Sequence, residues 1–275
     1  MTPTLLLTGA TGFVGRPVLE ALHGRNAKLR VVVRPDSAHQ LDWPQGTRLI
    51  HSNDLFAESS DWWARAAEGV DAVLHMAWYA EPGQYLQSPR NLDCLSGTLA
   101  MAKGCAQAAV ARFVGVGTCM EYDTSEGQLS TRTPLRPASP YAAAKAAAYL
   151  SLREYFRERK LSFAWCRLFY LYGENEDPRR LFPYVRRQLA QGLPVELTKG
   201  EQIRDYMDVR EAARELAEQL LGQREDAINI CSGRGVTVRE LVERLADEFG
   251  RRDLLRFGAR PDNVIDPPVV VGVKD

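Results

Sequence analysis

The sequence predicts an α/β fold built on a doubly wound parallel sheet. Apolar, β-branched segments alternate along the chain with segments of helical periodicity. The first apolar segment, residues 5–7, runs into a loop that contains Gly9, Gly12 and Gly15. Glycines at the end of a buried strand let the backbone turn tightly and approach a ligand closely. The helix expected from Arg16 to Leu22 would aim its free N–H groups at that ligand, which suits a pyrophosphate.

The other elements follow in a regular order. Further strands are expected at residues 29–34, 47–51, 71–77, 112–118, 162–167 and 228–230. Helices are expected at residues 61–68, 89–109, 141–159, 181–191 and 238–249, with another that ends at residue 221. Ser88 is the expected N-cap of the second of these helices, with Pro89 in its first position. Ligands of such a sheet bind at the carboxyl ends of the strands, where Gly9, Arg34, Ala77 and Thr118 fall.

Composition excludes several classes of protein. The 275-residue chain is long enough for a well-buried core, and its 35 Lys and Arg residues balance 35 Asp and Glu residues. It therefore lacks the basic excess of a nucleic-acid-binding protein. No apolar stretch approaches the ~20 residues of a membrane span, and no signal sequence is recognisable. We expect a cytoplasmic protein without a membrane span and without a nucleic-acid partner.

Cysteine and histidine spacing predicts no metal. The five cysteines form no Cys-x-x-Cys pair, so neither a disulfide framework nor a zinc site is indicated. The four histidines also lack ligand spacing. We interpret His75, near the end of an expected strand, as structural.

The glycine loop carries a family resemblance. Its spacing, Gly9-x-x-Gly12-x-x-Gly15, differs from the standard Gly-x-Gly-x-x-Gly fingerprint. The run from Thr8 to Gly15 instead resembles the extended short-chain dehydrogenases/reductases, the NAD-dependent epimerase/dehydratase family, in which nucleotide-sugar enzymes are common. The resemblance implies a Rossmann-type NAD(P)-binding domain, mainly residues 1–168. It also implies a smaller C-terminal α/β lobe for a nucleotide sugar, mainly residues 169–275, with the chain interleaving between the two.

The second strand bears on the choice of cofactor. Arg34 stands at its end, where an acidic residue would bind the ribose of NAD and an arginine accommodates the 2′-phosphate of NADP. Because a guanidinium matches a phosphate with paired hydrogen bonds, we favour NADP(H), with NAD(H) as the alternative. A merely solvated Arg34 is also possible. Together with the resemblance, the predicted cofactor-binding residues are Gly9, Thr11, Gly12, Phe13, Val14, Gly15, Arg34, Asp54, Leu55, Ala77, Tyr141 and Lys145.

A tyrosine and a lysine four residues apart suggest the chemistry. Tyr141 and Lys145 share one face of the expected helix, and a nearby ammonium lowers the pKa of a phenol from ~10. The resemblance makes Thr118, Tyr141 and Lys145 a catalytic triad. Thr118 would then bind the substrate oxygen, Tyr141 would donate a proton and Lys145 would hold the nicotinamide ribose. Cys94 stands where the family has an asparagine, so the role of that asparagine toward the lysine must be filled differently.

The residues after Thr118 discriminate among reactions. Dehydratases of the family carry an Asp-Glu pair there, whereas this chain has Cys119-Met120 and a thioether cannot transfer a proton. Cys119 is also one position out of register for the cysteine of 3,5-epimerases, and we interpret it as a small packed residue that borders the substrate. A 4-epimerase that recycles tightly bound NAD and a ketoreductase that consumes NAD(P)H remain.

Arg34 and the run from Gly117 to Tyr122 favour the ketoreductase, because that run resembles reductases of nucleotide-linked 4-keto-6-deoxyhexoses in polysaccharide and antibiotic pathways. A third hypothesis is a protein that only senses NADP. Such relatives typically lose the tyrosine or the lysine, and both are present here.

The resemblance also extends to the substrate and the assembly. Gly200 and Arg204 match a Gly-x-x-x-Arg-Asp pattern whose arginine binds the substrate diphosphate, and Arg260 resembles a second anion-binding position. Either arginine could instead be a surface charge. In this family the helix after Ser88 and the helix carrying Tyr141 often pair across a two-fold axis, which predicts a homodimer.

Overall fold

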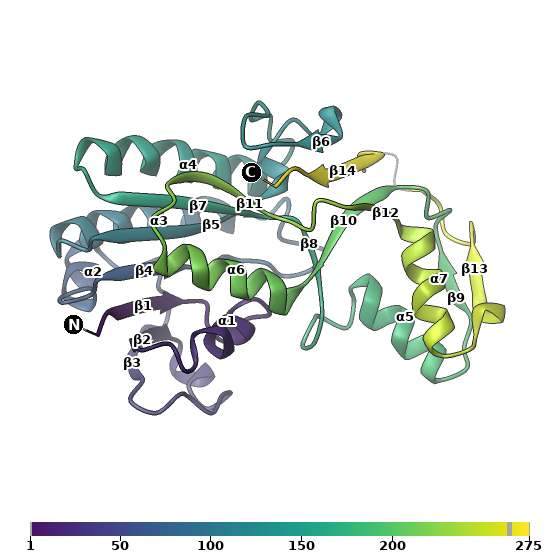
Figure 1. Ribbon diagram of the computed structural model, residues 1–275, viewed down its shortest axis with the longest axis horizontal. Helices are drawn as coiled ribbons and strands as arrows, with labels where there is room; N and C mark the ends of the chain where they lie inside the picture. Colours follow the sequence, from purple (N-terminus) through teal and green to yellow (C-terminus); the bar gives the residue numbers. More distant parts are fainter. Residues whose placement is uncertain (1, 263–265, 275) are drawn as a thin grey trace.

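The central sheet has seven parallel strands in the order β11-β7-β5-β4-β1-β2-β3 (Figure 1). The computed structural model describes residues 2–262 and 266–274. The strands are β1 (Thr4–Thr8), β2 (Lys28–Val33), β3 (Arg48–His51), β4 (Ala72–His75), β5 (Arg112–Thr118), β7 (Ser162–Leu168) and β11 (Asp226–Ile230). Each overlaps a strand expected from the sequence. The order reverses between β1 and β4, which is where ligands bind in doubly wound sheets.

Helices cover both faces of this sheet. In Figure 1, α1 (Gly15–Leu22) and α6 (Val209–Leu221) lie in front of it, and α2 (Ser60–Ala66), α3 (Arg90–Gln107) and α4 (Pro140–Glu158) lie behind it. Successive residues of a strand point to opposite faces, so Leu5 and Leu7 join the core under α1 and α6, whereas Leu6 joins the other core. Burial on both faces explains why β1 is a continuous apolar run.

The smaller part of the molecule projects from the carboxyl ends of the central strands, on the right of Figure 1. Its sheet has the order β12-β10-β14-β6, with β8 paired to β10. These strands are β6 (Gln128–Leu129), β8 (Tyr170–Tyr172), β10 (Ile203–Asp208), β12 (Gly235–Thr237) and β14 (Val269–Gly272). A parallel pair, β9 (Val195–Leu197) and β13 (Leu255–Phe257), packs with α5 (Leu181–Ala190) and α7 (Val238–Glu248) around a separate apolar core.

The chain passes between the two parts more than once. β11 and α6 come from the C-terminal third of the sequence, yet β11 pairs with β7 and α6 shares a core with α1. In the other direction, β6 pairs with β14. Neither part is therefore a continuous stretch of sequence.

Two local features were not expected. Residues 170–172 form strand β8, parallel to β10. Helix α3 begins at Arg90, one residue later than expected, so Pro89 and not Ser88 is the N-cap. The Ser88 hydroxyl still accepts a hydrogen bond from the Arg90 N–H at 3.3 Å. Among the described residues, no helix is both long and apolar enough to span a bilayer.

Glycines set the distance between α2 and α3. A Cβ at Gly104 would lie 2.4 Å from the Ser60 carbonyl oxygen, and one at Gly97 would lie 2.4 Å from the Phe56 Cα. Both neighbours are backbone atoms that cannot move aside by a rotamer change. The small residues of α3 therefore permit a close helix pair behind the sheet.

We predict that Gly104→Ala destabilises the protein by about 1–3 kcal/mol, because overpacking outweighs the gain in helix propensity of about 1 kcal/mol. Ser96→Ala, at an exposed position of the same helix, is the control and should leave stability unchanged or slightly higher. Urea denaturation measures both. Equal stability of the two variants would contradict the close packing.

Candidate active site

The loop after β1 is shaped by glycines that other residues could not replace. Gly9 has a φ of +73°, and a Cβ there would lie 2.7 Å from the backbone nitrogen of Ala77 at the end of β4. A Cβ at Gly15 would lie 2.1 Å from the Gly9 carbonyl oxygen. The loop is therefore pressed against both β4 and the start of α1. Thr11, Phe13 and Val14 remain partly exposed beside it, and no side chain caps α1.

The other residues predicted to bind the cofactor lie at neighbouring strand ends. Arg34 follows β2 directly and is exposed. Asp54 is exposed after β3, and its Oδ1 accepts a hydrogen bond from the Phe56 N–H at 3.0 Å, which fixes that turn. Ala77 is buried, and its N–H donates to the Thr8 hydroxyl at 3.3 Å. Leu55 packs beside the core behind the sheet.

His75 has a structural environment. Its Nδ1 lies 2.8 Å from the Thr8 hydroxyl oxygen and its Nε2 lies 2.9 Å from that of Thr98. Because the Thr98 hydroxyl donates to the Cys94 carbonyl, Nε2 is the nitrogen that donates to Thr98. Burial lowers the pKa of His75 to about 3, so the ring is a neutral link between β1, β4 and α3.

The structure brings Thr118, Tyr141 and Lys145 together. Thr118 is the last residue of β5, and its hydroxyl lies close enough to the Tyr141 phenol to lower the pKa of that phenol, against the larger effect of burial. Tyr141 lies in the first turn of α4, which Ser139 caps by accepting a hydrogen bond from the Ala142 N–H. Lys145 is 3 % exposed, and its Nζ donates to the Val116 carbonyl oxygen at 2.6 Å.

The pKa of the tyrosine does not follow the sequence-based expectation. Burial raises the pKa of Tyr141, and the nearby Tyr85, whose ring centroid lies 4.9 Å away, acts in the same direction. Lys145 was expected to lower it. Its Nζ instead bonds Val116 and lies 3.9 Å from the centroid of the Trp78 ring, and burial lowers its own pKa to about 7. Burial thus dominates at both groups.

Cys94 stands where the family has an asparagine, and in this structure Trp78, held by Asn91, contacts the lysine instead. The Trp78 ring faces Lys145, and its Nε1 donates to the Asn91 side-chain oxygen at 2.9 Å. The Asn91 amide in turn donates to the Tyr85 carbonyl at 2.6 Å. Cys94 itself accepts a hydrogen bond from the Tyr79 N–H at 3.4 Å. An aromatic face held by an asparagine one helical turn earlier therefore contacts the lysine.

The predicted substrate residues differ in their surroundings. Arg204 on β10 is 2 % exposed and forms an ion pair of 2.7 Å with Asp266, while its Nη1 donates to the Ile203 carbonyl. Arg260 is exposed, and its Nη2 donates to the Tyr184 hydroxyl at 3.0 Å. Cys119 is buried in an apolar cluster, and burial raises the pKa of its thiol to about 12, in keeping with a packed residue.

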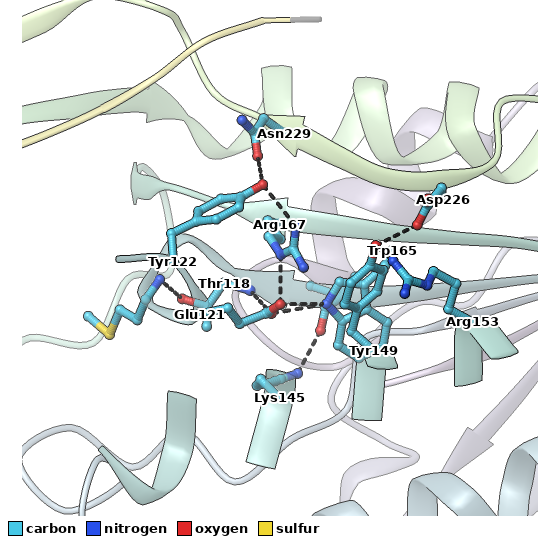
Figure 2. Close-up of polar contacts among 12 residues, drawn as sticks. Thr118, Glu121, Tyr122, Lys145, Tyr149, Arg153, Trp165, Arg167, Asp226 and Asn229 are labelled. Carbon is cyan, nitrogen blue, oxygen red and sulfur yellow. Dashed lines mark hydrogen bonds and ion pairs between the residues drawn. The ribbon is translucent and has the colours of Figure 1, made fainter. Parts of the chain in front are cut away.

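Sequence reasoning missed the residues behind Thr118. Glu121 and Arg167 are 0 % and 1 % exposed and form an ion pair, with Trp165 alongside. Figure 2 shows the Glu121 carboxylate beside Thr118, with Trp165 and Arg167 bonded to it. One signal was present in the sequence, since Thr118-x-x-Glu121 is a capping-box spacing.

Comparisons with known proteins identify the family of this chain. Residues 5–231 match the model of the NAD dependent epimerase/dehydratase family. A dTDP-6-deoxy-L-talose 4-dehydrogenase (NAD(+)) from Aggregatibacter actinomycetemcomitans is 23% identical over 274 residues, which cover 98% of this chain and 99% of the relative.

Two solved structures have a similar fold. DesIV, a dTDP-glucose 4,6-dehydratase from Streptomyces venezuelae with NAD bound, superposes with a TM-score of 0.83 at 26% identity, covering 98% of this chain and 88% of that one. A UDP-glucose 4-epimerase from Thermus thermophilus in complex with NAD gives a TM-score of 0.82 at 25% identity, with coverage of 98% and 90%. The fold, the glycine loop and the match over residues 5–231 lead to one conclusion: this chain is an enzyme of the NAD-dependent epimerase/dehydratase family, within the extended short-chain dehydrogenases/reductases.

Proposed function

We propose that this enzyme reduces the 4-keto group of a nucleotide-linked 4-keto-6-deoxyhexose with NAD(P)H. The observation that supports the proposal most is the position of the Thr118 hydroxyl beside the Tyr141 phenol, with a buried Lys145 on the same helix at the carboxyl edge of the sheet. Cys119 and Met120 follow Thr118 where a dehydratase needs proton-transferring groups. The relative named as a dTDP-6-deoxy-L-talose 4-dehydrogenase adds support, because its name places its chemistry at position 4 of a 6-deoxyhexose.

The residues around the first loop fit a dinucleotide. Side chains at Gly9 and Gly15 would collide with backbone, so the loop leaves its outer surface open and presents the uncapped start of α1 to a pyrophosphate. In this proposal Arg34, Asp54, Leu55 and Ala77 line the adenosine side of the cofactor. The cofactor, when bound, supplies the hydride.

The chain itself supplies binding and the proton. The Thr118 hydroxyl would bind the substrate carbonyl oxygen, and the Tyr141 phenol would donate its proton to that oxygen as it becomes a hydroxyl. A raised phenol pKa keeps Tyr141 protonated at neutral pH, as a proton donor must be. Lys145 would hold the nicotinamide ribose. Arg204 would exchange Asp266 for the substrate diphosphate, with Arg260 as a second anion contact, while Cys119 borders the sugar.

Two other functions remain as alternatives. A 4-epimerase with tightly held NAD is supported by the epimerases among the similar proteins, including the Thermus enzyme with bound NAD. A protein that only senses NADP is disfavoured, because Tyr141 and Lys145 are both retained and placed together with Thr118.

The nucleotide carried by the purified protein tests the cofactor assignment. We expect no stoichiometric nucleotide after denaturation and mass spectrometry, and NADPH binding that weakens at least about tenfold in Arg34→Ser, because the exposed guanidinium of Arg34 pairs with the 2′-phosphate. NADH binding is the internal control and should change less than about twofold. Stoichiometric NAD would favour the epimerase, and equal losses for both nucleotides would remove the role of Arg34.

Tyr141→Phe tests the reaction. We predict that NAD(P)H oxidation with nucleotide-linked 4-keto-6-deoxy sugars falls at least about 100-fold, because the variant keeps the ring contacts and removes only the proton donor. Tyr155→Phe on the same helix is the control, since that ring stacks with Arg159 at the far end of α4. Cofactor binding should be unchanged in both. Full turnover by Tyr141→Phe would refute the assigned proton donor.

We also propose a homodimer formed through α3 and α4. Each of these helices carries an exposed leucine, Leu92 at 67 % and Leu150 at 44 % exposure, which pairing of the two helices across a two-fold axis would cover. Sedimentation should show a dimer at micromolar concentration that Leu150→Glu converts to monomer. Leu193→Glu, an equally exposed leucine before β9, should remain dimeric. A wild-type monomer would refute the assembly.

A further inference from the structure

Glu121 is a fully buried carboxylate whose two oxygens are both occupied. Its Oε1 accepts hydrogen bonds from the Thr118 N–H at 2.8 Å and from the Trp165 Nε1–H at 3.0 Å. Its Oε2 accepts from the Arg167 Nε–H at 2.6 Å. A charge in such a place is tolerated only when it is paired and fully hydrogen-bonded. Glu121 is therefore held in one orientation directly behind Thr118 (Figure 2).

Glycines of β5, the strand that ends at Thr118, leave space for this carboxylate and for the Trp165 ring. A Cβ at Gly117 would lie 2.4 Å from Glu121 Oε1 and 2.2 Å from Trp165 Nε1. A Cβ at Gly115 would lie 2.3 Å from the Trp165 ring. β5 thus lacks side chains at the two positions where β7 presents its indole. The arrangement depends on the whole Gly-x-Gly-Thr-x-x-Glu sequence and not on Glu121 alone.

Arg167 is fixed from its outer side. Its Nη1 donates to the Tyr122 hydroxyl at 2.9 Å, and that hydroxyl donates to the Asn229 side-chain oxygen at 2.7 Å. The guanidinium also lies over the rings of Tyr122 and Tyr149, at 4.5 and 4.4 Å from their centroids. These contacts hold the positive end of the pair away from the catalytic side.

The negative end faces Lys145. The Lys145 Nζ is bonded to Val116, two residues before Thr118, and lies 5.8 Å from the centroid of the Trp165 ring that donates to Glu121. Figure 2 shows Lys145 pointing from α4 toward this carboxylate. The Trp165 indole therefore lies near the Lys145 ammonium group and donates a hydrogen bond to the Glu121 carboxylate.

Three other titratable groups near Lys145, on α3, α4 and β4, are neutral. Burial raises the pKa of Cys94 on α3 and of Tyr141 on α4, and burial lowers the pKa of His75 on β4 to about 3. Arg167 on β7 is positive but is turned toward Tyr122. Within the described part of the chain, Glu121 is therefore the anion that acts on Lys145. Burial lowers the pKa of Lys145 to about 7, and Glu121 opposes that fall.

We propose that Glu121 is a positioning residue of the active site, which fixes the backbone of Thr118 and provides the counter-charge that favours the ammonium form of Lys145. Its catalytic meaning rests on the proposed reductase function. The effect of Glu121 on the charge of Lys145 does not depend on that function, so it can be measured without any substrate.

The direct test is an NMR titration of Lys145 in the free enzyme with 13Cε-labelled lysine, the resonance being assigned by its loss in Lys145→Met. In Glu121→Gln the Lys145 pKa should fall by at least about one unit, a tenfold loss of proton affinity. Because that variant leaves Arg167 buried without its partner and could fail to fold, Glu121→Gln/Arg167→Met is measured as well. The same fall is expected there, since Arg167 is turned away from Lys145.

Trp165→Phe is the matched control. It removes the indole N–H that donates to both oxygens of Glu121, without changing any charge, so the Lys145 pKa should move much less than in the glutamine variants. An unchanged Lys145 pKa in the double variant would overturn the proposal. So would an equal fall in Trp165→Phe, which would assign the effect to packing.

A kinetic measurement separates this inference from the proposed function. If the wild type reduces a 4-keto sugar, the double variant should lose kcat at unchanged sugar KM, with the alkaline limb of its pH profile moved to lower pH. An alkaline limb at the same pH as in the wild type would count against the proposed role of Glu121. If the wild type reduces none of the sugars, the proposed function fails, and the NMR titration still decides the role of Glu121.

Discussion

The close approach of three backbone segments at two glycines is the constraint on which the rest of this structure depends. The loop after β1 touches the end of β4 through Gly9 and the start of α1 through Gly15, at distances that leave no room for a Cβ. Because the strand order reverses at this pair of strands, the contact defines both the crossing of the sheet and the place where a ligand lies. Thr8 and His75 then connect the same strands with buried hydrogen bonds.

Much of the central sheet could be predicted from the sequence, because most of its strands are buried on both faces and read as largely apolar runs of four to seven residues. The short strands of the smaller part could not. β6 has two residues and β9 has three, which is too few for a periodic pattern, and their pairing partners are far away in sequence. β8 also has only three residues and lies within an aromatic segment, so it could not be predicted either.

The candidate site likewise contains features that could be predicted from the local sequence and features that could not. The positions of Thr118, Tyr141 and Lys145 followed from a spacing of four on a helix and from a strand end, both of which are local features. The direction of the Tyr141 pKa did not follow, because it depends on burial by Tyr85 and Trp78, which reach the helix from a loop more than fifty residues earlier. Glu121 was foreseeable only as a helix cap, since its partners Trp165 and Arg167 lie on another strand.

The interleaving of the chain has a consequence for its synthesis. The edge of β7 stays unpaired until residues 226–230 have been made, and α6, which covers the cores of β1 and β4, comes only shortly before them. A nascent chain of some two hundred residues therefore presents an open apolar strand edge and an uncovered face of the sheet, both of which favour association with other chains. Folding of the nucleotide-binding half must wait for the last third of the protein, so slow translation or early termination in that region would leave an aggregation-prone product.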